Sequence, residues 1–267
     1  MSTIQDYTSQ TRIKGSMLQV NHIRLSYGPR LVLDDVSFTV APGEKAGLIG
    51  VNGAGKSSLL NIIAGLQDAD GGTIILPRMY GYLSQDVAHE SSIAEGGTVR
   101  NFIFNSIGLD AAIDAYEELT NKVAEAEDGD LPALLRRFEQ VQDTLERLGY
   151  YDADARAEQL IAGLNLVGVT LDRYVHTLSG GQKTKLALVR LLFQAPDLLL
   201  LDEPTTHLDA LSRNIIGEAL GNYNGTIIAV THDVEFVSYL HPDTMLIMPQ
   251  GRIIPYGTEH NELLKRA

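Results

Sequence analysis

The sequence predicts an α/β fold: a parallel sheet covered on both faces, a small antiparallel β layer and a helical sub-domain. Short continuous apolar runs (KAGLIG, DLLLLD and GTIIAVT) each end at polar residues, as strands buried on both faces do. The stretches MLQVNHIRLSY and LVLDDVSFTV alternate apolar and polar residues, which is typical of half-exposed antiparallel strands. Between Gly97 and Gly149, apolar residues recur at steps of three and four, the spacing of amphipathic helices.

These patterns divide the chain into segments. Residues 1–16 are polar and lack the apolar core of a signal peptide, so we expect a disordered leader. Residues 17–257 form one large domain, in which residues 86–176 are the helical sub-domain. Within it we expect a helical hairpin over about 109–149, with an acidic tip at AEDGDLP. The simplest interpretation of its apolar residues is that they pack the sub-domain on itself.

The composition limits the possible function classes. Lys and Arg number 21 against 34 Asp and Glu, and the net charge of −13 disfavours broad, non-specific adhesion to nucleic acid or anionic lipid. The chain has no cysteine, which excludes disulfides, thiolate metal sites and thiol nucleophiles and suits a reducing compartment, so we expect a cytoplasmic protein. No stretch reaches the roughly 18 apolar residues of a membrane span.

A glycine-rich segment predicts a phosphate-binding loop. Gly50–Ser57 fits G-x-x-x-x-G-K-[ST], follows the strand KAGLIG and precedes the helical SSLLNIIAGL. Glycines let consecutive N–H groups point inward, and the following helix adds its N-terminal partial positive charge. We expect Lys56 to reach the terminal phosphates and the Ser57 hydroxyl to be a Mg²⁺ ligand. The alternative, a glycine-rich turn without a ligand, is weakened by the strand and helix around it.

Two adjacent carboxylates predict the second half of the same site. DLLLLDEP, residues 197–204, ends a buried strand in Asp202 and Glu203. Asp202 at the end of the strand can hold Mg²⁺ through water, and Glu203 can orient and deprotonate an attacking water. The alternative is a solvated acidic turn after a core strand, which the phosphate loop makes less attractive.

A third motif makes the resemblance specific. TLSGGQKTKLALVRLL, residues 177–192, places LSGGQ at the start of a helix just before the carboxylate strand, and this arrangement resembles the ATP-binding cassette (ABC) ATPases. Ser179, Gly180 and Gly181 lie at a helix N-terminus, which is again an anion site. In that family this helix end serves the ATP of a facing domain. The purely local alternative is a serine N-cap followed by flexible glycines.

The resemblance implies roles for further residues, which occur in the family's order. Tyr27 in LSYGPR matches the aromatic that stacks on adenine, and Gln85 in GYLSQD matches the glutamine that senses Mg²⁺ and the γ-phosphate. Asp209 in HLD matches the loop at the dimer interface, and His232 in VTHD matches the histidine that contacts the γ-phosphate. The family is a P-loop NTPase fold with Mg²⁺-dependent ATPase activity.

The implied site therefore comprises three sets of residues. The implied catalytic residues are Glu203, His232, Lys56 and Gln85. The implied metal ligands are Ser57, Gln85 and Asp202. The implied nucleotide-binding residues are Tyr27, Gly50, Asn52, Gly53, Ala54, Gly55, Lys56, Ser57, Ser58, Ser179, Gly180, Gly181 and Asp209. The implied cofactors are ATP and Mg²⁺.

Three features favour the ABC-F branch. The separation of Gln85 from Ser179 is longer than transporters usually need, and the excess is the hairpin, where ABC-F proteins carry their arm. Lys183, Thr184 and Lys185 after LSGGQ are similar to ABC-F sequences, and DEPTTHLD departs from the ABC-F pattern DEPTNHLD only by Thr206. The alternatives are the nucleotide-binding subunit of a transporter and a scaffold ATPase of DNA repair, whose zinc-binding cysteines are absent here.

The resemblance also implies partners. The chain looks like the N-terminal half of an ABC-F protein, with residues 258–267 as the start of the linker. One phosphate loop and one LSGGQ complete no ATP site in a single copy, so we expect a second cassette, from a missing half or a homodimer. The resemblance implies action at the ribosome near the tRNA exit site, where some ABC-F proteins relieve the inhibition caused by ribosome-targeting antibiotics. The acidic hairpin tip argues against a strong grip on RNA.

Overall fold

The computed structural model describes residues 9–13, 17–85, 97–126, 130–206 and 208–257. They belong to two compact units. The first unit comprises Met1–Asp86 with Ala195–Ala267, and the second unit comprises Val87–Gln194. The predicted helical sub-domain ended at residue 176, whereas the second unit continues to Gln194 and includes the helix that follows LSGGQ.

The first unit contains the predicted parallel sheet. Its strand order is β10-β9-β4-β8-β7-β6, and all pairs are parallel except β10 with β9. The bounds are β4 Lys45–Ile49, β6 Tyr80–Leu83, β7 Leu198–Asp202, β8 Thr226–Val230, β9 Thr244–Ile247 and β10 Arg252–Pro255. Every residue of β7 and β8 is buried, which confirms that the continuous apolar runs are central strands.

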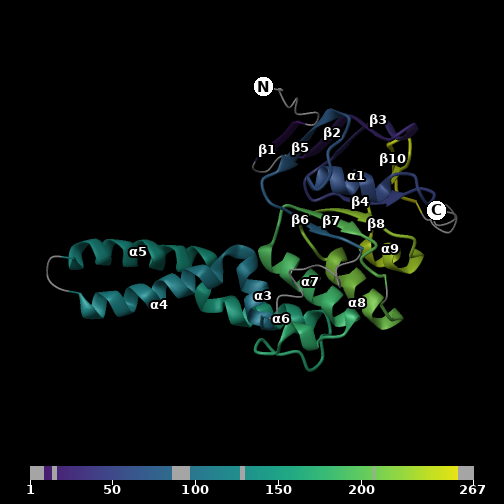
Figure 1. Ribbon diagram of the computed structural model, residues 1–267. Coiled ribbons are helices and arrows are strands. Elements are labelled where there is room, and N and C mark those ends of the chain that lie inside the picture. The colour runs from purple at the N-terminus through teal and green to yellow at the C-terminus, as the bar shows by residue number, and fades with distance from the viewer. Residues whose placement is uncertain (1–8, 14–16, 86–96, 127–129, 207, 258–267) are drawn as a thin grey trace, which may run out of the picture. The chain divides into compact units, whose positions relative to one another are not determined.

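A four-stranded sheet of order β1-β5-β2-β3 forms the second layer of this unit (Figure 1). The bounds are β1 Ser9–Ile13, β2 Leu18–Tyr27, β3 Arg30–Val40 and β5 Gly71–Pro77. Strand β2 pairs antiparallel with β3, as the alternating pattern predicted, and it also pairs antiparallel with β5. Val20, Ile23 and Val36 are fully buried, whereas His22 and Asp35, next to Ile23 and Val36, are exposed, so one face of the sheet covers the core.

Strand β1 corrects the prediction of a disordered leader over residues 1–16. Ser9–Ile13 pairs in parallel with Thr73–Pro77 of β5. Backbone hydrogen bonds make such a ladder and need no apolar side chains, so a polar segment can complete a sheet edge that β5 would otherwise leave open. The remaining leader residues, 1–8 and 14–16, lie outside the described residues, as does the expected linker at 258–267.

Among its described residues the first unit also has three helices: α1 Lys56–Ile63, α8 Ala210–Gly221 and α9 Val234–Leu240. Buried residues of α1, such as Leu59 and Leu60, share one hydrophobic cluster with both sheets, in keeping with the place of α1 between the two layers in Figure 1. Val237 of α9 packs with Ile49 and Met245, and α8 packs against α9. Packing of these helices against the sheets gives the first unit a continuous core.

The described part of the second unit is helical. Its helices are α3 Val99–Phe104, α4 Leu109–Glu125, α5 Leu131–Leu148, α6 Ala153–Gly163 and α7 Gly180–Gln194, with short 3₁₀ turns at Asn105–Ile107, Tyr150–Asp152 and Val175–Thr177. Helix α7 packs against α3 and α6, and the rings of Phe104 and Phe193 stack at 5.7 Å. This shared core explains why α7 belongs to the second unit.

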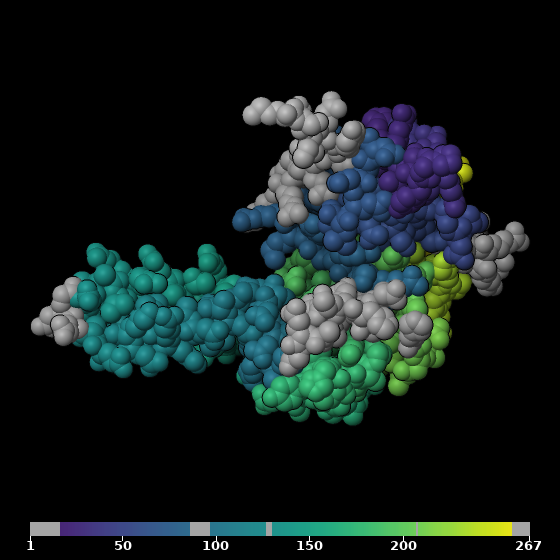
Figure 2. All heavy atoms as spheres, in the orientation of Figure 1, coloured from purple at the N-terminus to yellow at the C-terminus, as the bar shows by residue number. Residues whose placement is uncertain are grey.

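Helices α4 and α5 lie side by side and form the predicted hairpin, which projects from the other helices of its unit (Figures 1 and 2). The rings of Tyr116 and Phe138 are 4.9 Å apart, and Leu119 and Leu145 are buried. Residues 127–129 of the expected acidic tip lie outside the described residues. No helix in the described part of the chain is long and apolar enough to cross a membrane.

Candidate functional site

The first unit has a cavity of about 510 Å³ at the carboxyl ends of the parallel strands. This edge is where α/β sheets commonly bind ligands. The lining residues are Tyr27, Arg30, Val32, Asn52, Gly53, Gly55, Lys56, Ser57, Ser58, Gln85, Asp202, Glu203, Thr206, Val230 and His232. Eleven positions predicted from the sequence are thus brought together, from β2, the loop before α1, and the ends of β6, β7 and β8.

The loop that precedes α1 depends on glycine geometry. Gly55 has φ 87° and is the N-cap of α1, a conformation that favours a residue without Cβ. A Cβ at Gly55 would lie 2.7 Å from Cδ2 of Leu33 and 2.9 Å from Cγ1 of Val32. A Cβ at Gly50 would lie 2.9 Å from the carbonyl oxygen of Met248. The loop is therefore packed closely beneath the cavity. Gly55 has no side chain that could cap the first N–H groups of α1.

Lys56 places a cation inside the cavity. Its side chain is 8% exposed, and Nζ donates to the carbonyl oxygens of Gly50 and, at 3.4 Å, Val51. Burial lowers the pKa of Lys56, and the nearby carboxylates of Glu203 and Asp202 raise it. The loop carbonyls hold the ammonium group where it can meet an anion that enters the cavity.

Asp202 ends β7 with a buried carboxylate that is 3% exposed. Burial raises its pKa, whereas a hydrogen bond with the Ser57 side chain and the charge of Lys56 lower it. Its Oδ1 is buried without a hydrogen-bond partner among the described residues, which is costly unless something else satisfies it. An unsatisfied carboxylate oxygen beside a hydroxyl fits a hard cation such as Mg²⁺.

This potential metal site is sparse in protein ligands. The described part of the chain contains no cluster of three or more His, Cys, Asp or Glu side chains that could hold a metal ion. Mg²⁺ commonly binds through one or two protein ligands, with waters and substrate phosphates completing its shell. Ser57 and Asp202 therefore fit an ion that arrives together with a phosphate-bearing ligand.

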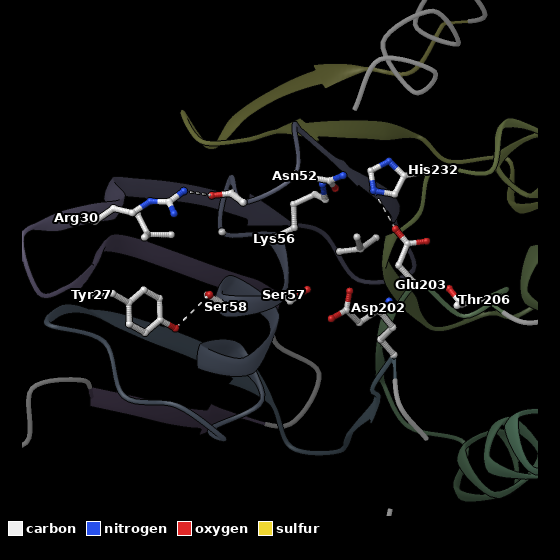
Figure 3. A pocket seen from close by; sticks show the side chains of 15 residues that line it. Tyr27, Arg30, Asn52, Lys56, Ser57, Ser58, Asp202, Glu203, Thr206 and His232 are labelled. Carbon is white, nitrogen blue, oxygen red and sulfur yellow. Dashed lines mark hydrogen bonds and ion pairs between the residues drawn. The ribbon is translucent and has the colours of Figure 1, made fainter. Parts of the chain in front are cut away.

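Glu203 and His232 form a pair at one end of the cavity (Figure 3), with 3.1 Å between Oε1 and Nε2. Glu203 has φ 49°, uncommon for a residue with Cβ, and its N–H donates to the Val230 carbonyl oxygen at 3.0 Å. Burial, with the adjacent Asp202 charge, raises the pKa of Glu203 to about 7. Burial and then Lys56 lower the pKa of His232. A carboxylate whose pKa lies near 7 can accept a proton from water at neutral pH.

Tyr27 lies at the opposite end of the cavity from this pair (Figure 3). The ring is 53% exposed, and its hydroxyl accepts a hydrogen bond from Nε2 of Gln67 at 2.8 Å and lies 3.4 Å from Oγ of Ser58. These contacts hold the hydroxyl end of the exposed ring, and the face of an exposed aromatic ring can stack on a base. The predicted sensor, Gln85, lines the cavity with an exposed side chain.

Four lining residues escaped prediction from the sequence: Arg30, Val32, Thr206 and Val230. Thr206 and Val230 adjoin predicted motifs, so a wider motif window would have included them. Arg30 pairs with Tyr27 across the two-residue turn Gly28-Pro29. That turn was the available signal, because a tight hairpin puts the two flanking residues opposite each other.

The remaining predicted residues do not line the cavity. Gly50 and Ala54 lie in the loop beneath it, and Ala54 is buried. Asp209 is the N-cap of α8 and accepts from Ser212 N at 2.8 Å and Ser212 Oγ at 2.6 Å. The neighbouring His207 of the HLD motif lies outside the described residues.

The LSGGQ residues belong to the second unit. Ser179 and Gly180 are exposed at the start of α7, followed by the partly exposed Gly181. Ser179 Oγ accepts from the N–H of Gln182 at 3.3 Å, and the Gln182 side chain accepts from the N–H of Ser179 at 3.0 Å. This reciprocal arrangement is a capping box, so the predicted serine cap is present.

Comparison with known proteins gives the family. Residues 33–206 match the ABC transporter family model. The chain is 38% identical over 88% of its length to the tylosin resistance ATP-binding protein TlrC of Streptomyces fradiae, covering 43% of that protein. It is 35% identical over 91% of its length to the energy-dependent translational throttle protein EttA of Mycobacterium tuberculosis, covering 42%.

A plant relative extends the comparison. The chain is 34% identical over 84% of its length to ABC transporter F family member 5 of Arabidopsis thaliana, covering 33% of that protein. The chain thus spans less than half the length of each of these relatives. The family match and the relatives together show that the chain belongs to the ATP-binding cassette family and is a cassette of the ABC-F type.

Proposed function

We propose that the chain binds ATP with Mg²⁺ and hydrolyses it, as one cassette of a protein that acts in translation or ribosome protection. The observation that carries this proposal is the cavity in which Lys56, Ser57, Asp202 and the Glu203–His232 pair surround one space. Each of these residues supplies a part that phosphoryl transfer to water needs.

The roles follow from position and charge. The loop N–H groups and Lys56 bind the β- and γ-phosphates, and Ser57 and Asp202 would hold Mg²⁺, which neutralises phosphate charge when bound. Glu203 orients the attacking water and takes its proton, since its pKa lies near neutral. His232 holds the Glu203 carboxyl group at 3.1 Å and faces the γ-phosphate from the same end of the cavity. Gln85 senses the ion and the γ-phosphate from the rim.

A second cassette completes the mechanism. The chain has one phosphate loop and one LSGGQ, and the exposed start of α7 offers Ser179 and Gly180 to an anion outside its own unit. We place this helix end on the nucleotide of a second cassette, and a second cassette's equivalent on the nucleotide held by Lys56. ATP then closes the pair head to tail, with the Asp209 loop at the interface, and hydrolysis reopens it.

The relatives support a role in translation. One is named an energy-dependent translational throttle protein and another a tylosin resistance ATP-binding protein. We therefore propose the ribosome with its tRNA as partner of the whole protein, and the cytoplasm as its location. The alternative, an energy-supplying transporter subunit, has the names of the family model and of the plant relative in its favour, but not the relatives named for translation and for tylosin resistance.

The test uses Glu203→Gln in a protein that carries this cassette together with a second cassette. We expect ATP binding to persist while turnover falls by about 10² to 10⁴ fold, because the proton acceptor is lost. The ATP-locked variant should also inhibit cell-free translation. Glu218→Gln, an exposed position on α8, is the matched control.

Two outcomes would contradict the proposal. Normal turnover by Glu203→Gln would remove the base role. An ATP-locked protein that leaves translation unaffected and co-purifies with a membrane protein would favour the transporter subunit.

A further inference from the structure

Arg30 is a cavity residue to which the mechanism above gives no role. It opens β3 directly opposite Tyr27, the last residue of β2, across the turn Gly28-Pro29. Gly28 has φ 59°, the left-handed conformation that lets the chain reverse within two residues. Residues opposite each other in an antiparallel pair point to the same face of the sheet. The hairpin therefore presents an aromatic ring and a guanidinium group to the cavity together.

The guanidinium group reaches the phosphate loop. Nη2 of Arg30 donates to the carbonyl oxygen of Gly53 at 3.4 Å, and a Cβ at Gly53 would stand 3.2 Å from this nitrogen. Because Gly53 has no side chain, the guanidinium group approaches the loop without a tight contact. Arginine has five N–H donors, and this bond uses one of them.

Arg30 also lacks a neutralising partner. Within the described residues no carboxylate lies within ion-pair distance of it, although Asp202 and Glu203 line the same cavity. In Figure 3 those carboxylates lie at the other end, with Lys56 and Ser57 between them and Arg30. The described lining of the cavity thus has two lysine or arginine cations, Lys56 near the carboxylates and Arg30 near the aromatic ring.

We propose that Arg30 is a nucleotide-binding residue that contacts the phosphate chain on the side nearest the ribose. This inference rests on the proposed function, since it takes the ligand to be ATP. A planar guanidinium group matches phosphate oxygens in a two-pronged geometry. Because Arg30 lies beside the ring end and away from Glu203, it meets phosphate that ATP and ADP share. It therefore strengthens the binding of both nucleotides and leaves the hydrolytic step unchanged.

The experiment is isothermal titration of the chain and of Arg30→Gln with ATP and with ADP, together with adenosine competition against a fluorescent ATP analogue. Because the site is open to solvent, we expect Arg30→Gln to weaken ATP and ADP binding by about fivefold each and to leave adenosine unchanged. Arg30→Lys keeps the positive charge but not the planar guanidinium group, so its nucleotide affinity should lie between those of the unsubstituted chain and of Arg30→Gln. Arg24→Gln is the matched control, an exposed β2 arginine 3.9 Å from Asp34 that does not line the cavity.

The outcomes separate this inference from the function on which it rests. If the unsubstituted chain binds ATP and Arg30→Gln binds it equally well, Arg30 has no such role, while the proposed function stands. If adenosine weakens as much as ATP, the contact is not with phosphate and the inference is overturned. If the unsubstituted chain binds no ATP, the proposed function fails and the inference with it. A circular dichroism melt of each variant checks that the fold is retained.

Discussion

Two helices of this chain begin at glycine-rich sequences that were predicted to bind anions, and they differ in what meets their first N–H groups. Helix α1 follows Gly55, which has no side chain and sits at φ 87°. Helix α7 follows Ser179, whose hydroxyl is hydrogen-bonded within a capping box with Gln182. The first helix start is open to a ligand inside its own unit, whereas the second is stabilised by its own side chains and faces solvent.

We infer from this difference that a glycine-rich helix start is not sufficient for a ligand site. Around α1 the structure adds a buried lysine, a buried aspartate with an unsatisfied oxygen and a Glu–His pair. Around Ser179 the described residues provide the capping box with Gln182 and no comparable cavity. We infer that the α1 site binds its ligand alone, and that the α7 site contributes only when a second cassette brings a nucleotide to it.

The largest expected effect on the comparison of the two helix starts comes from replacing a lysine at each of them. Lys56→Ala removes the buried cation, and we expect ATP affinity to fall by about 10 to 100 fold, the range for hydrogen bonds to charged groups. Lys183→Ala, in the first turn of α7, is the matched control and should leave the affinity of the isolated chain unchanged. Isothermal titration measures both. Equal losses in the two variants would contradict the distinction between the helix starts.

The next effect concerns the glycines themselves. Gly55→Ala forces a Cβ to within 2.7 Å of Leu33 at a positive φ, and we expect the free energy of unfolding to fall by about 3 kcal/mol. A Cβ at Gly180 meets nothing within 4 Å, so Gly180→Ala should change it by less than about 0.5 kcal/mol. Urea titration followed by circular dichroism compares them. A neutral Gly55→Ala would show that the loop is not packed as described.

The stability of the chain should depend on pH because Glu203, which pairs with His232 in the α1 cavity, has a raised pKa. The pKa of Glu203 is raised from 4.5 to about 7, so the folded chain holds this proton more tightly than the unfolded chain does. Stability is therefore lost as the pH rises from about 4.5 through 7, where the unfolded state is ionised and the folded state resists ionisation. Glu203→Gln removes the penalty and should stabilise the chain by about 1–3 kcal/mol at pH 8.

This gain should vanish toward pH 4.5, where Glu203 is protonated in the folded chain. Thermal melts of the two proteins between pH 4.5 and 8 give the curve. A stability difference that is independent of pH, or that grows on acidification, would show that the folded chain does not raise the pKa of Glu203.

The smallest expected effect lies at α7. Ser179→Ala removes one half of the capping box, and we expect about 1 kcal/mol of lost stability. ATP affinity of the isolated chain should not change, whereas ATP hydrolysis by a paired protein should fall. Ser179→Thr keeps the hydroxyl and is the control for the cap. A loss of ATP affinity in the isolated chain would mean that this helix end binds nucleotide without a partner.

Features that depend on a short stretch of sequence could be predicted. The phosphate loop, the carboxylates after β7 and the hairpin helices each depend on a short spacing, and the structure has them in place. Strand β1 could not be predicted, because its pairing comes from backbone hydrogen bonds to a distant β5. The membership of α7 in the second unit depends on tertiary packing with Phe104, which no periodicity reports.

The site also contains features that only the fold creates. Arg30 reaches the cavity because a two-residue turn sets it opposite Tyr27 and because Gly53 leaves room. The raised pKa of Glu203 depends on burial beside Asp202, and the unsatisfied Oδ1 of Asp202 depends on how β7 ends. Motifs therefore identify which residues meet, and packing decides their chemical state.

The most direct test of ATP binding at the α1 cavity is an isothermal titration of the chain and of Asp202→Asn, with and without Mg²⁺. Asp202 offers the cation a buried, unsatisfied carboxylate oxygen, so Mg²⁺ should strengthen ATP binding by the chain. In Asp202→Asn that gain should be largely lost, while magnesium-free binding persists through Lys56. If the chain shows no ATP binding that depends on Mg²⁺, or if Asp202→Asn responds to the ion as strongly as the chain does, the cavity is not the site described here.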